Sequence, residues 1–498
     1  MALLGIDLGT TACKAVAYDD GGRVLAKARR EYKILRPRSQ WAEVDPADLF
    51  RAVKSVIFEI NQSCTEKIRA IGFSSQGEGV VPLDSNFKPL GNIILSYDGR
   101  SLAQTERLGK VLGGDFLFGT GGQILASMGT ATKIMWILDN PSYYPERPSY
   151  FACVGDYVIS CFGCRPTIDY SLASRTMIFD VHKLRWSQPV LDAVGIEETM
   201  MSKVQKAGSI VDKISMKAAE ELGLSPNTFI VAGGHDQPCA MLGTGATGKG
   251  EAAYSLGTTE TLICSMDSFY GELEKYGLPC YPHIVENKFI TLPGNFTGGI
   301  ILQWYKEQFA GLENKIAGEI NTDAYDIIMS EVDEVPSKLL VLPHFTVTGS
   351  PYNDSQSMGA IFGLHLDTKK GEFIRGLLEG VTYEILLNIM LLKEMGIQIS
   401  VLRTVGGGTK SGKILQLKSD ILGVPLYVPR DTEAPCKGAA ILAAKAVGLV
   451  DDVESAWKEK EENIIAYFPN MEHNNYYKEQ FEKYKLLYPM IKNLQQKK

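Results

Sequence analysis

The chain has 498 residues, of which 45% are hydrophobic and 22% are charged, and its formal net charge is −7. This apolar content is ordinary for a globular protein, so a largely disordered chain is excluded. The 51 basic and 58 acidic residues form no basic block, which argues against a nucleic acid or an anionic membrane as partner. At about 150 residues per domain, the length fits roughly three domains or two large ones.

The apolar residues and cysteines indicate a reduced, cytoplasmic environment. No apolar run reaches the roughly 18 residues of a membrane span. The first residues lack the charged start and the long apolar core of a signal peptide. Nine cysteines are an odd number and too few for a disulfide scaffold in a chain of this length.

The N-terminal residues predict three β-strands in succession. Short apolar runs cover residues 2–8, 13–18 and 23–32, and the sequence Asp-Asp-Gly-Gly at 19–22 separates the last two. Because Gly and Asp tolerate the positive φ angles of hairpin turns, an antiparallel meander is expected here.

A helix and a further strand are expected after the meander. Asp45 and Pro46 are residue types favoured at a helix N-cap and at the first helical position. Apolar residues then recur at helical spacing up to Ile60, so one face of this helix should be buried. Residues 68–74 predict a strand that leads into the Gly-rich sequence at 76–79.

The two halves of the chain share a repeated sequence. Leu-Gly-Thr-Thr at 8–11 recurs at 256–259, almost half the chain later, and each copy lies between two strand-like runs. The repeat indicates duplication of a β-rich α/β unit, although a match of four residues is also compatible with chance. The boundary is placed in the Gly-rich stretch 243–250, which gives two domains, 1–245 and 246–498.

The second half alternates helices and strands, which predicts an α/β layer architecture. Its expected elements are a helix at 299–309, a strand at 338–342, a long helix at 372–394, a strand at 400–405, a helix at 413–422, a strand at 425–428 and an Ala-rich helix at 437–447. The final stretch, 471–498, is rich in Lys and Tyr and is expected to form an amphipathic surface helix.

The hairpin sequence at 5–11 is a candidate phosphate site. Its glycines expose backbone N–H groups, and Thr10 and Thr11 add hydroxyl donors, a combination that suits phosphate oxygens. Asp7 is a candidate ligand of Mg²⁺ through water, and Lys14 would add positive charge. The alternative is an ordinary hairpin in which threonine merely favours strands.

The second copy of the hairpin sequence strengthens the phosphate interpretation. Two such hairpins, one from each half, would form a clamp around a polyphosphate in an interdomain cleft. The three glycines at 406–408 offer a third place where the backbone could approach a nucleotide. A Walker A loop at 407–414 is excluded, because Ile414 stands where Ser or Thr must reach the metal.

Further polar residues follow strand-like or loop segments. Asp236 comes after an apolar strand and two glycines and is a candidate general base, with a helix cap as the alternative. The neighbouring His235 is interpreted as a hydrogen-bonded structural residue. Gln76, Glu78 and Asp98 suit a polyhydroxylated ligand, because amides and carboxylates bind vicinal hydroxyl groups, and solvated turns are the alternative.

Together these residues resemble the FGGY family of carbohydrate kinases. The resemblance runs from residue 5 to about 445, and its motifs stand in the order found in that family. The matching segments are 7–11, 76–78, 98–100, 132–136, 234–237, 256–259, 298–299 with 303–304, 375–380, 406–416 and 437–440. A single motif of this kind is weak evidence, but ten in the family's order are specific.

The resemblance implies an α/β fold of two duplicated ribonuclease-H-like domains, as in actin, Hsp70 and hexokinase, with the active site in the cleft between them. It places Asp7 near the metal and makes Asp236 the catalytic base. The expected ATP-binding residues are Thr10, Thr11, Lys14, Gly257, Thr258, Gly299, Gln303, Gly407 and Ser411. The expected substrate-binding residues are Gln76, Glu78, Asp98, Asp236 and Gln237.

The resemblance implies that the protein transfers the γ-phosphoryl group of ATP to a hydroxyl group of a sugar or polyol, with Mg²⁺ as cofactor. A ketose such as a pentulose is the favoured acceptor. Glycerol kinases have Arg-Glu where this chain has Gly77 and Glu78, and a substrate-contacting Tyr where Met128 is aligned. The absence of the arginine and tyrosine side chains leaves more room for the acceptor, which favours a sugar or longer polyol over glycerol. The Met-His pair common in xylulokinases is also absent.

Several alternatives stay open. The acceptor could be glycerol, another polyol or gluconate, and a catalytically inactive protein that binds nucleotide and sugar would share the same motifs. The expected partners are a small sugar or polyol and ATP or ADP, with no nucleic acid and no membrane. A homodimer is a further alternative, with the unassigned segment 270–287 as a candidate interface.

Overall fold

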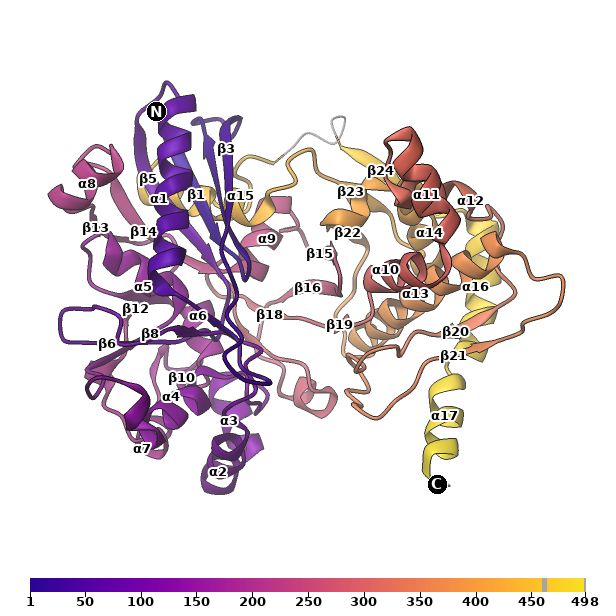
Figure 1. Cartoon of the computed structure of the whole chain (residues 1–498), viewed down its shortest axis with the longest axis horizontal. Helices are drawn as coiled ribbons and strands as arrows, with labels where there is room; N and C mark the ends of the chain where they lie inside the picture. The colour runs from indigo at the N-terminus through magenta and orange to yellow at the C-terminus, as the bar shows by residue number, and fades with distance from the viewer. Residues whose placement is uncertain (459–463, 497–498) are drawn as a thin grey trace.

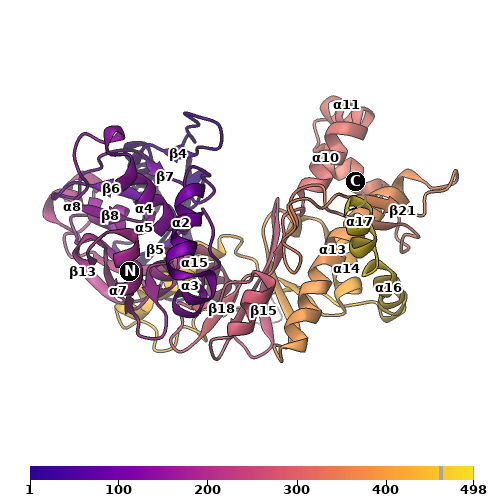
Figure 2. The ribbon, with the colours of Figure 1, turned by 90° about the horizontal axis from the view of Figure 1, so that it is seen from below.

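The computed structural model of the chain describes residues 1–458 and 464–496. These residues form two lobes, each built on a mixed β-sheet with helices packed around it (Figures 1 and 2). The first half of the chain makes one lobe and most of the second half makes the other (Figure 1). Within the described residues, no helix combines the length and the apolar character that crossing a membrane requires.

The first lobe contains a six-stranded sheet in the order β13-β14-β5-β1-β2-β3. Its strands are β1 (Ala2–Leu8), β2 (Ala12–Tyr18), β3 (Val24–Glu31), β5 (Ile68–Ser75), β13 (Ile210–Lys213) and β14 (Phe229–His235). The meander predicted from the sequence and the strand that follows it are therefore confirmed, with ends that differ by one residue. Short two-stranded pairs complete the lobe: β4 (Glu43–Val44) with β7 (Ile93–Ile94), β6 (Val81–Leu83) with β8 (Tyr150–Ala152), β9 (Thr167–Asp169) with β12 (Lys203–Gln205), and β10 (Phe179–Asp180) with β11 (Arg185–Trp186).

The helices of the first lobe begin with α1 (Pro46–Ser63), where the predicted N-cap is confirmed. The Asp45 carboxylate accepts a hydrogen bond from the backbone N–H of Ala47, and the apolar face of α1 is buried as far as Ile60. The other helices are α2 (Leu102–Leu112), α3 (Gly114–Gly121), α4 (Thr130–Asp139), α5 (Val154–Cys161), α6 (Tyr170–Arg175), α7 (Gln188–Val194), α8 (Met216–Leu222) and α9 (Asp236–Thr244).

The second lobe contains a larger sheet, in the order β17-β18-β16-β15-β22-β23-β24, with β19 paired to β16. Its strands are β15 (Glu251–Leu256), β16 (Glu260–Met266), β17 (Tyr281–Pro282), β18 (Phe289–Thr291), β19 (Gly294–Asn295), β22 (Val401–Val405), β23 (Leu426–Val428) and β24 (Ile465–Tyr467). A separate pair is formed by β20 (Leu340–Leu342) and β21 (Ala360–Phe362). The helices are α10 (Ile300–Phe309), α11 (Gly311–Ile320), α12 (Ala324–Glu331), α13 (Lys370–Glu394), α14 (Gly412–Leu422), α16 (Met471–Tyr484) and α17 (Leu487–Gln496).

The two sheets repeat one pattern of strands, which confirms the predicted duplication. In the first lobe β1 lies between the antiparallel β2 and the parallel β5, and β14 lies parallel beyond β5. In the second lobe β15 lies between the antiparallel β16 and the parallel β22, and β23 lies parallel beyond β22. The outermost strands β13 and β24 are antiparallel to their neighbours in both sheets. This is the arrangement expected of two related α/β domains.

The repeated Leu-Gly-Thr-Thr sequences form equivalent turns of unequal length. Leu8 pairs with Cys13 across the hairpin of β1 and β2, whereas Leu256 pairs with Glu260 across the hairpin of β15 and β16. The second turn is therefore one residue shorter than the first. We call these turns the first hairpin (residues 9–12) and the second hairpin (residues 257–259).

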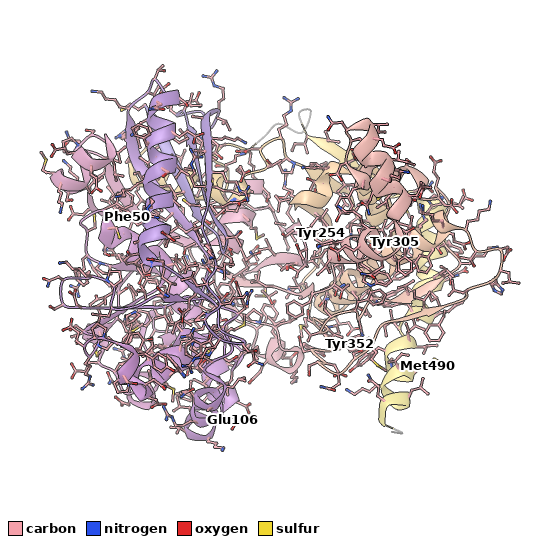
Figure 3. All side chains as sticks on the ribbon, in the orientation of Figure 1. Phe50, Glu106, Tyr254, Tyr305, Tyr352 and Met490 are labelled. Atoms are coloured by element: carbon pink, nitrogen blue, oxygen red, sulfur yellow. The ribbon has the colours of Figure 1, made fainter. Side chains whose placement is uncertain are left out.

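Each lobe has its own apolar core. Phe50 on α1 packs against the core of the first lobe. Tyr254 on β15 and Tyr305 on α10 belong to the core of the second lobe (Figure 3). Separate cores indicate that the lobes are structural domains, consistent with the duplication.

Helix α15 (Ala434–Ala446) lies late in the chain yet packs on the sheet of the first lobe (Figure 1). Gly5 on β1 is paired with Gly72 on β5. A Cβ atom at Gly5 would lie 1.9 Å from the carbonyl oxygen of Cys436, and one at Gly72 would lie 2.1 Å from that of Ala439. Since real Cβ atoms do not approach so closely, α15 can rest on these two strands only because both positions are glycine.

Helix α9 approaches α15 equally closely. A Cβ atom at Gly438 of α15 would lie 2.0 Å from the carbonyl oxygen of Cys239, and one at Gly243 of α9 would lie 1.9 Å from that of Ala434. The two helices and the sheet therefore form one tightly packed unit.

The division into residues 1–245 and 246–498 separates the two sheets and stays a prediction. Helix α15 belongs to the second of these ranges, although its backbone lies against the first sheet and α9. The terminal stretch 471–498 is not one helix. It forms α16 and α17, which are separated at Lys485 and Leu486, and its last two residues lie outside the described ranges.

We expect the substitution Gly72→Ala to destabilise the first lobe, because its methyl group would collide with the backbone of α15. Overpacking of this kind typically costs about 1–3 kcal/mol, so the free energy of unfolding measured in urea should fall by roughly that amount. Gly318→Ala in α11 is the matched control, since no atom lies within 4 Å of a Cβ atom built there. A Gly72→Ala variant as stable as the control would contradict the role given to this glycine.

Candidate active site

A cavity of about 350 Å³ lies between the two lobes, and we call it the interdomain cavity. Thr10 of the first hairpin and Thr259 of the second both line it, so the two repeated turns face one space. The polar residues that complete its wall are Gln76, Glu78, Ser96, Arg175, His235, Asp236 and Gln237 of the first lobe, and Thr261, Asn295, Ser350 and Asn353 of the second.

Asp236 is the first residue of α9 and lines the interdomain cavity. Its Oδ1 atom accepts a hydrogen bond from Gln237 Nε2 at 3.0 Å. Burial raises the pKa of Asp236 to about 7, and the charges of Asp7 and Glu78 add to this effect. A carboxyl group with a pKa near neutrality can take up a proton under ordinary conditions, as a general base must.

His235 has a structural position, as the sequence suggested. Its Nδ1 atom lies 2.9 Å from the hydroxyl oxygen of Tyr281, and its Nε2 atom lies 3.2 Å from Asp236 Oδ1. Burial, with the nearby Arg175 charge, holds the pKa of His235 well below its ordinary value, so the imidazole is neutral. The neutral ring orients the Asp236 carboxylate without neutralising it.

Asp7 lies near the end of β1 and is buried. Its Oδ1 atom accepts a hydrogen bond from Ser74 Oγ at 2.8 Å. Burial raises the pKa of Asp7 to about 6, and the charge of Lys14 opposes this rise. Because Asp7 also raises the pKa of Asp236, the two carboxyl groups are close enough to interact.

The carboxylate of Asp7 fits a Mg²⁺ ion. Magnesium in phosphate-transferring sites is usually held by one or two carboxylates together with water and phosphate oxygens. In residues 1–458 and 464–496 no group of three or more His, Cys, Asp or Glu side chains could hold a metal by itself. The protein would therefore supply only part of the coordination, as that arrangement requires.

Glu78 and Arg175 form an ion pair in the wall of the interdomain cavity. Arg175 Nη1 also donates a hydrogen bond to Gln123 Oε1 at 2.7 Å, and the guanidinium carbon lies 5.3 Å from the centre of the Tyr281 ring. Burial lowers the pKa of Arg175, but its interactions with Glu78, Tyr281 and Asp236 together raise it above its ordinary value. The guanidinium group is therefore charged.

Gly77 leaves room that Arg175 occupies. A Cβ atom at Gly77 would lie 3.2 Å from Cγ and 3.3 Å from Cβ of Arg175. The stem of Arg175 therefore lies directly beside Gly77, and the expectation that the acceptor site has more room than in glycerol kinases stays a prediction. Met128, the other position compared with glycerol kinases, has a side chain that is 42% exposed.

The ammonium group of Lys133 is fully buried and binds three loops around the interdomain cavity. Lys133 Nζ donates hydrogen bonds to the carbonyl oxygens of Glu78 at 3.0 Å, Ser96 at 3.1 Å and Met128 at 2.6 Å. Burial lowers the pKa of Lys133 to about 8, while the charges of Glu78 and Asp98 raise it. Since Glu78 and Ser96 line the cavity, Lys133 fixes part of its wall.

A second cavity, of about 740 Å³, lies in the second lobe, and we call it the second-lobe cavity. It is lined by all the residues of the second half that were expected to bind ATP, namely Gly257, Thr258, Gly299, Gln303, Gly407 and Ser411. Thr258 lines this cavity and Thr259 lines the interdomain cavity. The second hairpin therefore lies at the boundary between the two spaces.

The backbone around the second-lobe cavity suits an anion. Gly406 has a φ of 99°, and a Cβ atom there would lie 2.6 Å from the carbonyl oxygen of Leu256, so the approach of this loop to the second hairpin requires glycine. Ser411 caps α14, with its Oγ atom accepting a hydrogen bond from the N–H of Ile414. The N-terminal residues of α10 and α14 line the cavity, and helix N-termini favour phosphate groups.

Asp98 is not among the residues that line either cavity. Its carboxylate accepts hydrogen bonds from the backbone N–H of Ala42 at 2.6 Å and from Nε of Arg100 at 2.8 Å. With its oxygens engaged in the first lobe, Asp98 joins two loops. This position corrects the expectation that it faces the substrate.

Two residues expected to bind ATP also lie outside the cavities. Lys14 Nζ is 2.8 Å from Glu433 Oε2, in the segment that leads into α15. Thr11 has an exposed side chain, and its carbonyl oxygen accepts a hydrogen bond from the N–H of Tyr32. Lys14 thus anchors the start of α15, and only Thr10 of the first hairpin lines the interdomain cavity.

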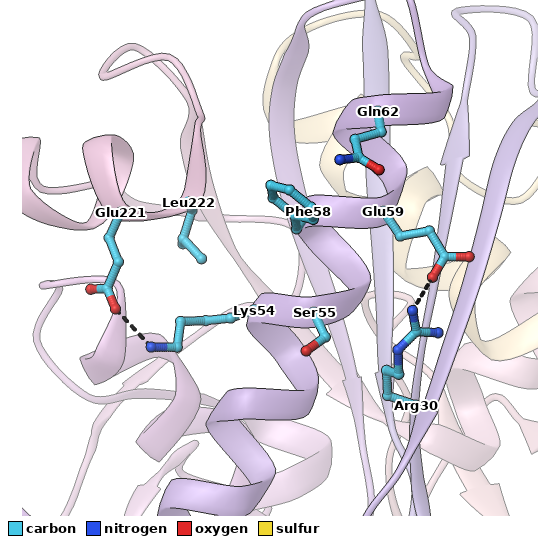
Figure 4. Close-up of a pocket in the computed structure, with 8 residues that line it drawn as sticks. All are labelled: Arg30, Lys54, Ser55, Phe58, Glu59, Gln62, Glu221 and Leu222. Carbon is cyan, nitrogen blue, oxygen red and sulfur yellow. Dashed lines mark hydrogen bonds and ion pairs between the residues drawn. The ribbon is translucent and has the colours of Figure 1, made fainter.

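A third hollow lies on the outer surface of the first lobe, between α1, β3 and α8, and has a volume of about 690 Å³ (Figure 4). Its charged side chains are paired with one another: Lys54 with Glu221 at 2.7 Å, and Arg30 with Glu59. Because these charges satisfy each other and none of the expected site residues is present, we assign the active site to the other two cavities.

Sequence reasoning missed several residues of the site. Arg175 ends a short helix with no motif around it, and the stretch 270–287, considered only as an interface, contributes Gly277, Leu278 and Pro279 to the interdomain cavity. Lys418 Nζ, 2.8 Å from Glu260 Oε2, lies in the wall of the second-lobe cavity. Only Lys133 carried a signal, since it belongs to the motif at 132–136.

Two family models match the chain. The N-terminal domain of the FGGY family of carbohydrate kinases matches residues 2–243, and the C-terminal domain of the same family matches residues 252–447. Residues 244–251, which lie between the two matches, overlap the Gly-rich stretch 243–250 in which the sequence placed the domain boundary.

Curated proteins and solved structures resemble the chain over nearly its whole length. It is 31% identical over 458 residues to a gluconokinase of Bacillus subtilis, covering 91% of this chain and 89% of that protein. It is 30% identical over 498 residues to a xylulose kinase of Staphylococcus epidermidis, covering 99% and 97%. The structure of the xylulose kinase from Rhodospirillum rubrum superposes with a TM-score of 0.88 at 21% identity and covers 99% of each chain.

We expect Lys133→Met to destabilise the first lobe and to weaken the acceptor site, because three carbonyl oxygens would lose their donor. A buried polar group left without a partner costs about 1–3 kcal/mol, and urea unfolding measures this loss. Lys110→Met on the neighbouring α2 is the control, since no hydrogen bond to the cavity loops involves it. Unchanged stability of Lys133→Met would contradict its role in holding the three loops.

Proposed function

The chain belongs to the FGGY family of carbohydrate kinases, phosphotransferases with an alcohol group as acceptor, and from this premise we propose that it phosphorylates a ketose such as a pentulose with ATP. One observation carries the proposal. Thr10 of the first hairpin, Thr259 of the second hairpin and Asp236 line a single cavity, and the second hairpin separates it from the second-lobe cavity. A base, two phosphate-binding turns and a nucleotide-sized space are thereby adjacent.

ATP would occupy the second-lobe cavity. Its triphosphate would lie along Gly257 and Thr258, where backbone N–H and hydroxyl donors are concentrated, with the rest of the nucleotide near Gln303, Gly407 and Ser411. The acceptor would occupy the interdomain cavity beside Gln76, Glu78 and Gln237. The γ-phosphoryl group would then cross the boundary formed by the second hairpin.

In the reaction, an acceptor hydroxyl oxygen bonds to the γ-phosphorus while the bond from that phosphorus to the bridging oxygen of ADP breaks. Asp236 receives the hydroxyl proton, a task that its position in the cavity and its pKa near 7 support. Thr10 and Thr259 approach the transferring group from opposite lobes. Positioning and neutralised oxygens contribute most to such transfers, since little covalent chemistry is required of the protein.

Asp7 is the residue that would hold Mg²⁺. When bound, the ion would neutralise the phosphate oxygens between the two hairpins. The protein's part is to keep Asp7 in place, which the hydrogen bond from Ser74 does. The interdomain cavity lies between the two lobes, so closure of the lobes would exclude water, a competing acceptor.

The proposal is tested by measuring ADP release from ATP and Mg²⁺ with a panel of pentuloses, hexuloses, polyols and aldonates. We expect at least one ketose to raise ADP release far above the rate without acceptor. A chain that binds nucleotide but releases no more ADP with any member of the panel would favour the inactive binding protein. Turnover of glycerol alone would support a glycerol kinase in place of a ketose kinase.

The variant Asp236→Asn tests the assigned base. Because asparagine cannot accept the proton, we expect kcat to fall by about 10²–10⁴-fold while the affinity for ATP is retained. Nucleotide binding measured by calorimetry would show that the second-lobe cavity is intact. Asp192→Asn is a matched control, since Asp192 is exposed on α7 and accepts a hydrogen bond only from Gln188 there. An active Asp236→Asn variant would refute the assignment.

A further inference from the structure

Arg175 enters the wall of the interdomain cavity from a rigid support. It is the last residue of α6, a short helix whose N-cap, Asp169, accepts hydrogen bonds from the backbone N–H groups of Ser171 and Leu172. Helix α6 also contacts β17 of the second lobe. The side chain is 12% exposed, so its charged end is almost entirely enclosed by protein and cavity.

Three contacts hold the guanidinium group in one orientation. Glu78 forms the ion pair, Gln123 Oε1 accepts a hydrogen bond at 2.7 Å, and the ring of Tyr281 lies 5.3 Å away. Gln123 is itself fixed, because its Nε2 atom donates to Ser174 Oγ at 3.0 Å. The group is therefore positioned before any ligand arrives.

This guanidinium group has donors to spare. Arginine carries five N–H donors, of which Glu78 and Gln123 engage two. The Nε atom of Arg175 is buried and has no hydrogen-bond partner, and Oε1 of the neighbouring Gln76 is also without one. Since buried polar groups without partners are costly, these atoms in the wall of the cavity are suited to the oxygens of a ligand.

The side chains at positions 77 and 175 exclude each other. A Cβ atom at Gly77 would lie 3.2 Å from Arg175 Cγ and 3.2 Å from His235 Cδ2, and the histidine ring is fixed by Tyr281. A side chain at position 77 therefore requires Arg175 or His235 to shift by a few tenths of an ångström. Gly77 and Arg175 thus act as one unit that determines the shape of this part of the cavity.

The charges around the cavity indicate which acceptor fits. Among the described residues that line it, Arg175 is the one Lys or Arg side chain, and Glu78 and Asp236 are the two carboxylic side chains. Arg175 is already paired with Glu78, so a carboxylate on the acceptor would meet no unpaired guanidinium or ammonium group there.

We infer that Arg175 is a specificity-determining residue that donates hydrogen bonds to acceptor hydroxyl oxygens, and that the acceptor is an uncharged ketose or polyol rather than an aldonate. This inference rests on the proposed kinase function, since it concerns the acceptor of that reaction. The paired guanidinium and carboxylate of Arg175 and Glu78 offer donors and acceptors side by side, the pattern that vicinal hydroxyl groups require.

The experiment compares Arg175→Gln, Arg175→Lys and the control Arg107→Gln in the full-length chain. Arg107 pairs with Asp139 on the outside of the first lobe, at 2.9 Å, so its variant removes an arginine charge without touching the cavity. We expect Arg175→Gln to raise the KM of the uncharged acceptor by about tenfold or more, the loss typical of hydrogen bonds to a charged group, and to leave the KM of ATP unchanged. Arg175→Lys should not restore the wild-type KM, because an ammonium group lacks the planar fork.

Gly77→Ser keeps the arginine but crowds its stem, so it should raise the same KM even if the Arg175 variants fold poorly. Two results would overturn the inference. One is an acceptor KM of Arg175→Gln within about twofold of the wild-type value, because losing a hydrogen bond to a charged group should cost more. The other is that the wild-type protein prefers an aldonate to the matching uncharged sugars. Measuring the binding of the same acceptors by calorimetry distinguishes a failure of this inference from a failure of the kinase proposal. Binding of an uncharged sugar that depends on Arg175 without ADP release would support the inference and contradict only the kinase proposal.

Discussion

The contact between α15 and the first sheet is the constraint on which the arrangement of the two lobes depends. A helix from the second half of the chain lies on β1 and β5 at a distance that only glycine permits, and α9 meets it with the same closeness. Lys14 and Glu433 fasten the segment that enters this helix. Because β1 leads into the first hairpin and α9 begins with Asp236, the packing of α15 also fixes the first hairpin and Asp236 relative to each other.

Duplication explains why the site lies between the lobes. Equivalent strands of both sheets end in equivalent turns, yet the turns have different surroundings: Thr10 and Thr259 line the interdomain cavity, while Gly257 and Thr258 line the second-lobe cavity. The second turn is one residue shorter than the first. The two related domains thus contribute differently: the second lobe forms the second-lobe cavity, and both lobes form the interdomain cavity.

Much of the fold was predictable because it depends on local patterns. Alternating apolar runs predicted the first meander, and the Asp45 cap predicted the start of α1. The repeated turn sequence indicated the duplication, and the order of the motifs indicated the family. Side-chain partners were not predictable, since they depend on distant segments. Asp98 is engaged by Ala42 and Arg100, Lys14 by Glu433, and Arg175 reaches Glu78 across almost a hundred residues.

Tyr281 has a consequence for how this enzyme could diversify. It belongs to β17, an edge strand of the second sheet, yet its hydroxyl group meets His235 and its ring lies beneath Arg175 of the first lobe. His235, which contacts Asp236, and Arg175, which pairs with Glu78, therefore both contact Tyr281. Tyr281 itself is not among the residues that line the interdomain cavity. Changes in β17 could therefore alter the selectivity for the acceptor. Relatives with identical cavity walls then need not share a physiological sugar.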